Sequence, residues 1–257
     1  MKSSGFGIDL SGKRAIVTGG SRGIGAAIVG QLSSAGADVA IGFATRSNDA
    51  ERVAGVARSR GVKAVAIAAD ISTREGSERL VREATEQLGG LDLFVGNAGI
   101  WPPEDVALAD MSDEQWERTI RQNLDSIFYT TRAVIRVIGA GGSIVLISST
   151  AGQRGEAFHA DYAASKGAVI SMTKSLAVEL GPSNVRVNCV APGWVDTEMV
   201  KDAIAEEGRD RIVSGIPLRR IATADDIAGP VLFLCSSLSR HVTGEILNVN
   251  GGSVLCG

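Results

Sequence analysis

Short aliphatic runs alternate with longer amphipathic stretches along most of the 257-residue chain, and this alternation constrains the fold more than any other feature. A strand of continuous aliphatic residues has to be covered on both faces, which is typical of parallel sheets. Strands that are each followed by a helix form such a sheet through right-handed crossovers. We therefore predict a doubly wound α/β sheet of about seven strands with helices on both faces. The expected strands are 14–18, 38–43, 64–68, 91–96, 143–148, 186–191 and 245–249, and the expected helices are 23–35, 48–60, 73–88, 113–138, 160–180 and 224–236.

The sequence predicts one domain over residues 1–257, because no linker rich in proline or serine, no repeat and no low-complexity segment interrupts the alternation. Segment 193–220 departs from the pattern: it follows a strand, comes directly after Pro192 and carries many charges. Insertions at the carboxyl edge of a parallel sheet commonly form lids over ligand sites. We predict a substrate lid here, with an ordinary pair of surface helices as the alternative.

Composition excludes several classes of protein. The formal net charge is −3 without any basic block, so a nucleic-acid partner is not expected. No run approaches the length of a membrane span, and the N-terminus lacks the apolar core of a signal peptide. Cys189, Cys235 and Cys256 are far apart and the chain has two histidines, which argues against a metal site. We expect a cytoplasmic protein with reduced thiols, no metal and a small-molecule substrate.

A glycine-rich turn, residues 18–25 (TGGSRGIG), joins the first expected strand to the first expected helix. Glycine permits positive φ and lets a pyrophosphate approach the backbone, while the helix N-terminus supplies free N–H donors. The spacing is Gly-x-x-x-Gly-x-Gly instead of the common Gly-x-Gly-x-x-Gly, so its position between strand and helix carries the argument. We predict a dinucleotide site. The expected contacts are Gly19, Ser21, Arg22, Gly23, Ile24 and Gly25.

The end of the second strand indicates which dinucleotide fits. An acidic residue there would bind the free ribose 2′-hydroxyl, whereas arginine favours a 2′-phosphate. No carboxylate precedes Asp49, while Arg46 lies close by and Arg22 in the glycine turn is a second candidate. We predict NADP(H) as the cofactor. Either arginine could instead be a solvated loop charge, and NAD(H) stays open.

Two further strand ends carry candidate cofactor residues. Asp70 and Ile71 follow the third strand, where the carboxylate could accept a hydrogen bond from an adenine amino group. Asn97, Ala98 and Gly99 end the fourth strand and are small enough for a ribose to approach closely. Turn chemistry is the alternative for both segments. Their shared place at carboxyl ends of strands favours ligand binding.

Tyr162 and Lys166 lie four residues apart in a stretch of helical composition, which places them on the same helix face. A nearby ammonium should lower the pKa of the phenol toward the range useful for acid/base catalysis. Such a pair would occur by chance in roughly 5% of chains of this composition, so alone it is only suggestive.

In combination, these segments resemble the short-chain dehydrogenase/reductase family of the single-domain kind, from about residue 10 to residue 252. The resemblance implies a Rossmann fold and hydride transfer between a nicotinamide and a carbonyl or secondary alcohol. The matching motifs, in family order, are the turn 18–25, Asp70, Asn97-Ala98-Gly99, Asn123, Ser149, Tyr162-x-x-x-Lys166, and Pro192-Gly193 followed by Thr197.

The resemblance also implies roles for the catalytic residues. Tyr162 would be the general acid or base, and Lys166 would lower its pKa and hold the nicotinamide ribose. Ser149 would hydrogen-bond the substrate oxygen, with Ser148 as the neighbouring alternative. Asn123 would bend its helix and bind a water that reaches Lys166; a satisfied helix-face asparagine is the alternative.

Further expectations concern the carboxamide and the assembly. Pro192 and Gly193, with Val195 and Thr197, would hold the nicotinamide carboxamide. The family implies a homotetramer, with a dimer as the alternative, built from the two long helices and the C-terminal strand region.

Three functions fit the chain. The first is an NADP(H)-dependent carbonyl reductase or alcohol dehydrogenase. The second is a 3-oxoacyl-[acyl-carrier-protein] reductase, which we rank lower because segments 138–142 and 181–184 lack the basic residues that would attract an acidic carrier. The third is a catalytically silent dinucleotide-binding sensor or scaffold, which has no need for an intact catalytic set.

The expected substrate pocket is formed by segments 100–103, 153–159 and 194–215. Its apolar candidates are Trp101, Phe158, Trp194 and Met199, and its polar rim candidates are Arg154, Glu156, His159 and Asp161. An apolar wall suits a hydrophobic or cyclic ketone, whereas the rim could steer a polar group, and the sequence leaves both open.

Overall fold

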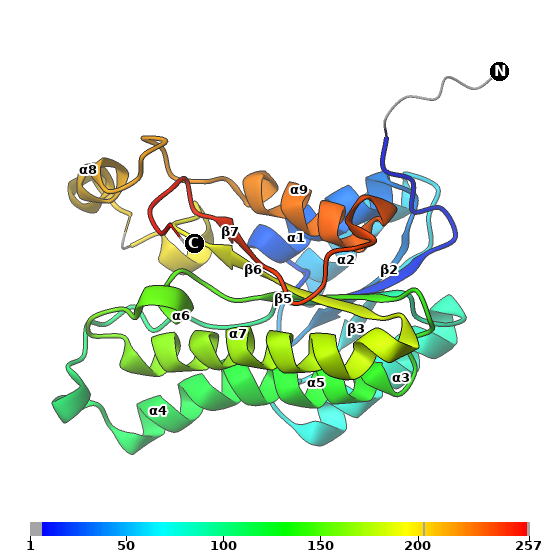
Figure 1. Cartoon of the computed structure of the whole chain (residues 1–257), viewed down its shortest axis with the longest axis horizontal. Helices are drawn as coiled ribbons and strands as arrows, with labels where there is room; N and C mark the ends of the chain where they lie inside the picture. Colours follow the sequence, from blue (N-terminus) through cyan, green and yellow to red (C-terminus); the bar gives the residue numbers. More distant parts are fainter. Residues whose placement is uncertain (1–6, 203, 256–257) are drawn as a thin grey trace.

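The computed structural model describes residues 7–202 and 204–255, apart from the side chains of residues 206 and 207. Cys256, considered above as a reduced thiol, lies outside the described residues. The described chain forms one parallel sheet of seven strands in the order β3-β2-β1-β4-β5-β6-β7, which confirms the predicted doubly wound Rossmann fold (Figure 1). The strands are β1 Arg14–Thr18, β2 Asp38–Phe43, β3 Ala64–Ala68, β4 Leu93–Gly96, β5 Ser143–Ile147, β6 Arg186–Pro192 and β7 Ile246–Val249.

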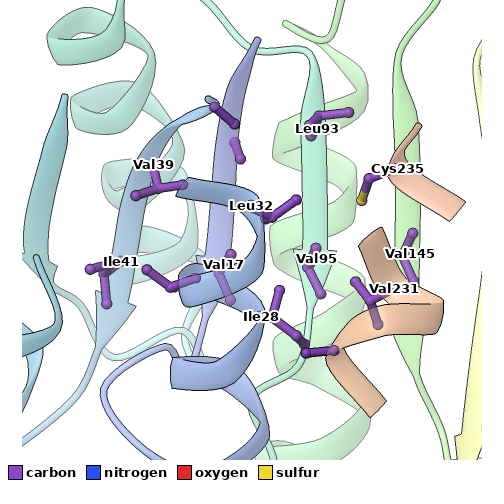
Figure 2. Packing of buried hydrophobic residues seen from close by; sticks show 14 of the residues in the cluster. Val17, Ile28, Leu32, Val39, Ile41, Leu93, Val95, Val145, Val231 and Cys235 are labelled. Atoms are coloured by element: carbon purple, nitrogen blue, oxygen red, sulfur yellow. The ribbon is translucent and has the colours of Figure 1, made fainter. Parts of the chain in front are cut away.

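The central strands are buried on both faces, while the edge strands β3 and β7 are partly exposed, and the aliphatic side chains alternate between two separate cores. On β1, Ala15 and Val17 point into one core while Ile16 points into the other. Figure 2 shows the first core, where Ile28 and Leu32 of the first helix lie over Val17 and its neighbours. This double burial explains why the strand sequences are continuously aliphatic.

Each core is closed by a layer of helices, and Figure 1 shows the two layers on opposite sides of the sheet. The first layer consists of α1 Gly23–Ser34, α2 Ser47–Arg58 and α9 Ala224–Cys235, and the second of α3 Arg74–Leu88, α5 Ser126–Ile135 and α7 Ala160–Leu180.

The single long helix expected at 113–138 is wrong in detail. The chain forms α4 Asp113–Ile120, then the π-helical turn η2 Arg121–Asp125, and then α5. A π turn adds a residue to one helical turn and shifts the side chains that follow, a distortion that is common at functional sites. Here it turns Asn123 inward, where the side chain is fully buried.

Segment 193–220 contains the short 3₁₀ turn η4 Glu198–Val200 and the helix α8 Glu206–Ser214. α8 stands apart from the sheet in Figure 1. The segment has its own apolar cluster, built around Ile204, Ile212 and Ile216. The substrate lid expected for this segment stays a prediction.

The remaining short elements connect these layers. They are η1 Leu108–Asp110, α6 Ala151–Arg154, η3 Gly181–Ser183 and η5 Ser237–Ser239. Within the described part of the chain, none of the helices combines the length and the apolar character needed to span a bilayer.

Candidate active site

An open cleft of about 420 Å³ follows the carboxyl ends of the strands from β1 to β6. All residues predicted to bind the cofactor line it, together with Ser149, whereas Asn123 lies behind its wall. The predicted residues in the lining are Gly19, Ser21, Arg22, Gly23, Ile24, Gly25, Arg46, Asp70, Ile71, Asn97, Ala98, Gly99, Ser149, Tyr162, Lys166, Pro192, Gly193, Val195 and Thr197.

The glycine turn has the tight geometry that a pyrophosphate requires. Gly19 and Gly23 have positive φ values of 64° and 52°. A side chain at position 25 would place its first carbon 2.2 Å from the Gly19 carbonyl oxygen, so only glycine fits there. Arg22, the N-cap residue of α1, carries no acceptor that could cap the first helix amides. Those amides can therefore donate to an anion in the cleft.

Thr18 ties the turn to the neighbouring strand. Its hydroxyl oxygen accepts from the backbone amides of Asn97 at 3.0 Å and Ala98 at 3.1 Å. The Asn97 side chain donates back to the Thr18 carbonyl at 2.9 Å. Asn97 thus braces the cleft floor with its amide group, a role the sequence analysis missed because it depends on the β1–β4 pairing across 79 residues.

The adenosine end of the cleft contains both candidate phosphate residues and Asp70. Arg22 and Arg46 come from different strand ends and are both half-exposed. Asp70 accepts from the Ser72 amide at 3.0 Å and from the Ser72 hydroxyl at 2.7 Å with the same oxygen. The turn chemistry considered for Asp70 is therefore present, and the residue also borders the cleft.

Two adjacent serines end β5, and their hydrogen bonds separate their roles. Ser148 is buried and donates to the Lys166 carbonyl at 2.7 Å, so its hydroxyl proton is not available to a substrate oxygen. Ser149 accepts from the Ala151 amide at 3.1 Å, lines the cleft beside Tyr162 and acts to lower the pKa of that phenol. The geometry favours Ser149, as the spacing predicted. Gly152, in α6, lets this helix pack directly against α7, because a side-chain carbon there would lie 2.5 Å from the Lys166 carbonyl carbon.

Tyr162 and Lys166 share one face of α7, with the Lys166 Nζ 5.8 Å from the centre of the Tyr162 ring. Nζ donates to the Ile147 carbonyl at 3.1 Å. Burial raises the pKa of the Tyr162 phenol to about 12, opposed by the Ser149 hydrogen bond and reinforced by the Glu156 carboxylate. Burial also lowers the pKa of Lys166 to about 8.

The expected lowering of the Tyr162 pKa by Lys166 is therefore wrong in this structure. The ammonium lies beside the ring and donates to a backbone carbonyl, so desolvation of the phenolate outweighs its attraction. The consequence is a phenol that keeps its proton at neutral pH. That is the form a general acid needs.

Asn123 holds the loop that follows β4. Its Oδ1 accepts from the Ile100 amide at 2.7 Å, and its Nδ2 donates to the Ile100 carbonyl at 2.9 Å and to the Ser165 hydroxyl at 3.2 Å. A side-chain carbon at position 99 would lie within 3.2 Å of both Asn123 Oδ1 and Lys166 Nζ, so these two groups approach the same point. The expected bend of the helix is present as the π turn.

Comparison with known proteins agrees with this geometry. A family model described as enoyl-(acyl carrier protein) reductase matches residues 19–253. The chain is 38% identical over 245 residues to the 3-oxoacyl-[acyl-carrier-protein] reductase FabG of Chlamydia muridarum, covering 95% of this chain and 98% of that one. It is 36% identical over 252 residues to the L-rhamnose 1-dehydrogenase (NAD(P)(+)) of Azotobacter vinelandii, covering 95% of this chain and 97% of that one. The crystal structure of a short chain dehydrogenase from Burkholderia cenocepacia in complex with NADP has a TM-score of 0.90 at 38% identity, over 95% and 98% of the two chains.

The chain belongs to the short-chain dehydrogenase/reductase family. The predicted family resemblance is thereby confirmed, and so is the oxidoreductase class that goes with it. The matched relatives carry different substrate names, so family membership by itself leaves the substrate of this short-chain dehydrogenase/reductase open.

The substrate end of this short-chain dehydrogenase/reductase has an aromatic wall. Trp101 stacks on His159 at a ring separation of 4.8 Å and meets Trp194 edge-on at 6.1 Å. Trp101, Trp194 and Met199 border the cleft, whereas the exposed ring of Phe158 is outside its lining. The apolar wall expected from the sequence is therefore present with three of its four members.

The polar rim differs more from expectation. Asp161 is fully buried and accepts from the Thr119 hydroxyl at 2.7 Å, so it anchors α7 to α4 instead of facing substrate. His159 is buried against the Pro102 carbonyl at 2.9 Å. Glu156 does border the cleft, and burial raises the pKa of its carboxyl.

The contact between Gly152 and α7 supplies a first test. Gly152→Ala should push α6 away from α7, displace Ser149 from Tyr162 and reduce activity at least about tenfold, with a lower melting temperature. Gly229→Ala is the matched control, since a methyl group at this helical position meets nothing within 4 Å. It should leave both quantities unchanged or raise stability slightly. Wild-type activity and melting temperature in Gly152→Ala would contradict the tight docking.

Proposed function

We propose that this enzyme reduces a carbonyl, or oxidises the matching secondary alcohol, with NADP(H). The observation that carries the proposal is the pair of neighbouring hydroxyls, Ser149 and Tyr162, on the wall of the cleft that also contains the glycine turn. Two hydroxyl donors that converge on one point suit a single oxygen that gains negative charge during the reaction.

In the proposed mechanism, Ser149 and Tyr162 both donate to the substrate oxygen and orient it. When bound, NADP(H) supplies the hydride that reaches the carbonyl carbon. Tyr162 transfers its proton to the oxygen as the carbon–oxygen double bond becomes single, and the product is the alcohol. Lys166 lies beside the phenol and stabilises the phenolate that this transfer leaves. In the oxidative direction the same groups act in reverse.

The residues present fit a dinucleotide with a 2′-phosphate. The positive φ of Gly19 and Gly23 and the uncapped amides at the start of α1 suit the pyrophosphate. Arg22 and Arg46 border the same end of the cleft, at the place where an adenosine ribose would lie. The Burkholderia cenocepacia relative, at 38% identity, was solved with NADP, which supports the same cofactor here.

A 3-oxoacyl-[acyl-carrier-protein] reductase is the alternative, favoured by the names of relatives such as the Chlamydia muridarum enzyme. The turns that lack basic residues, 138–142 and 181–184, precede β5 and β6 and therefore lie at the opposite edge of the sheet from the cleft. A carrier that docked there could reach only the cleft of a neighbouring copy. A free ketone fits the described chain better, and side-by-side assays with carrier-bound and free 3-oxoacyl substrates distinguish the two.

The proposed assembly is a homotetramer, with a dimer as the alternative. Its support is apolar surface on the outer helices: Trp116 on α4, Phe128 on α5 and Val178 on α7 are 40%, 44% and 79% exposed. Exposed apolar residues gathered on neighbouring helices suit a helix-to-helix contact between copies. We also propose a cytoplasmic location, for which Cys189 and Cys235, two buried unpaired thiols, give modest support.

The acid/base role predicts the behaviour of Tyr162→Phe. This variant should bind NADPH like the wild type but lose about 10²- to 10⁴-fold in kcat for ketone reduction, because the transferred proton is gone. Tyr129→Phe is the matched control, since Tyr129 packs against Phe128 and Arg132 on α5. NADPH oxidation followed by absorbance measures both. A residual rate within tenfold of the wild type in Tyr162→Phe would refute the assignment.

Lys166 predicts the pH profile. Its pKa is lowered to about 8, so the ammonium is present below that pH and lost above it, while Tyr162 keeps its proton because its own pKa is raised. We expect kcat/KM for reduction to fall as pH rises through about 8. Lys166→Arg keeps its charge and should extend the plateau, even at a lower rate. A wild-type profile that stays flat to about pH 9.5 would show that the ammonium is not required.

The cofactor assignment predicts the effect of Arg46→Asp. Replacing the arginine with a carboxylate should weaken NADPH binding by about tenfold or more and improve NADH binding, because the new charge repels the phosphate and can accept from a 2′-hydroxyl. Arg52→Asp is the control, since Arg52 pairs with the same Asp49 but lies outside the cleft lining. Equal effects of both substitutions on NADPH affinity would indicate general electrostatics instead of a phosphate contact.

A further inference from the structure

The two arginines at the adenosine end of the cleft are joined by a carboxylate from the lid. One oxygen of Glu198, in η4, lies 2.6 Å from Arg22 Nη1 and 3.1 Å from Arg46 Nη2. These three side chains come from the turn after β1, the start of α2 and the segment after β6. An anionic group bridged between two guanidinium groups is the arrangement that a bound phosphate would have.

The backbone of the lid holds Glu198 at this place. Thr197 sits directly over the glycine turn, where its methyl carbon would be 3.5 Å from a side-chain carbon added at Gly23. Both arginines hold the pKa of the Glu198 carboxyl below its usual range, the hydrogen bond from Arg22 being the larger cause. The bridging group is therefore an anion at neutral pH.

We propose that Glu198 is a specificity-determining residue that acts as an internal counter-ion of the 2′-phosphate site. This inference rests on the proposed function and deepens it. A phosphorylated cofactor must displace Glu198 from Arg22 and Arg46, whereas a cofactor with a free 2′-hydroxyl can bind with the carboxylate in place. Displacement also frees η4 from the glycine turn, so the identity of the cofactor is coupled to the position of the lid.

The charges near the site support a competition. Arg22 and Arg46 contribute two positive charges, and Glu198 together with Asp49, 3.4 Å from Arg46, contributes two negative ones. A 2′-phosphate brings close to two more negative charges and needs the arginines for itself. Asp49 is also paired with Arg52 at 3.7 Å, and displacement of Glu198 makes this group of side chains more positive by one charge.

Glu198→Gln tests the proposal by direct binding, without any substrate. We expect the dissociation constant for NADPH, measured by fluorescence titration at low salt, to fall roughly two- to tenfold, because exposed ion pairs of this kind are individually weak. The dissociation constant for NADH should stay within about twofold of the wild-type value. Asp196→Asn is the matched control: it removes a lid carboxylate that pairs with Arg209 at 3.9 Å and should change neither constant.

Combination with Arg46→Asp tests whether the effect passes through the phosphate site. If Glu198 competes for Arg46, Glu198→Gln should tighten NADPH less in the Arg46→Asp background than in the wild type. Equal gains in both backgrounds would contradict the competition.

The outcomes separate the inference from the function on which it rests. A wild-type enzyme that binds NADPH no more tightly than NADH overturns the cofactor assignment and this inference together. A wild-type preference for NADPH with no change in Glu198→Gln overturns only the inference. Weaker binding of both cofactors in Glu198→Gln would instead make Glu198 a clamp that stays over the bound dinucleotide, which also refutes the competition.

Discussion

Burial of the parallel sheet on both faces is the constraint on which the rest of this enzyme depends. Most aliphatic side chains of the central strands belong to one of two cores, as Ile16 and Val17 show on β1. The polar side chains that could bind a ligand therefore lie mostly at the ends of the strands. Because all seven strands run parallel, their carboxyl ends meet at one edge, and the cleft lies along that edge.

The catalytic groups depend on how tightly the segment after β5, residues 148–154, docks against α7. Gly152 of α6 lets the two backbones meet, and the Ser148 hydroxyl donates to the Lys166 carbonyl. Lys166 is buried and Tyr162 partly buried, and desolvation raises the pKa of the phenol and lowers the pKa of the amine. Desolvation by close packing thus favours the protonated phenol, and it lets the Lys166 amine lose its proton near pH 8.

The cofactor end is organised differently, by contacts between segments that are far apart in the sequence. Thr18 and Asn97 join the ends of β1 and β4 by hydrogen bonds, and Glu198 of η4 pairs with Arg22 and Arg46. The first set is partly buried and rigid, whereas the second is half-exposed and made of weak ion pairs. Hydrogen bonds that hold the base of the cleft, together with weak ion pairs at its entrance, suit a site where a cofactor enters and leaves.

The sequence by itself determined the fold class and the residues that line the cofactor part of the cleft. The aliphatic runs, the glycine turn and the spacing of Ser149, Tyr162 and Lys166 are local patterns. In a regular parallel sheet, the order of such motifs along the chain fixes the strand end at which each one lies. The sequence did not determine the π turn at Asn123, because the helix there yields to tertiary hydrogen bonds with Ile100 and Ser165.

Only the tertiary structure decided which polar groups face the ligand. It assigned Ser148 to a backbone carbonyl, buried Asp161 against Thr119, and set Glu198 between two arginines more than 150 residues away. It also reversed the expected shift of the Tyr162 pKa. These outcomes depend on desolvation and on contacts between distant segments, and neither quantity is encoded in the spacing of residues along the chain.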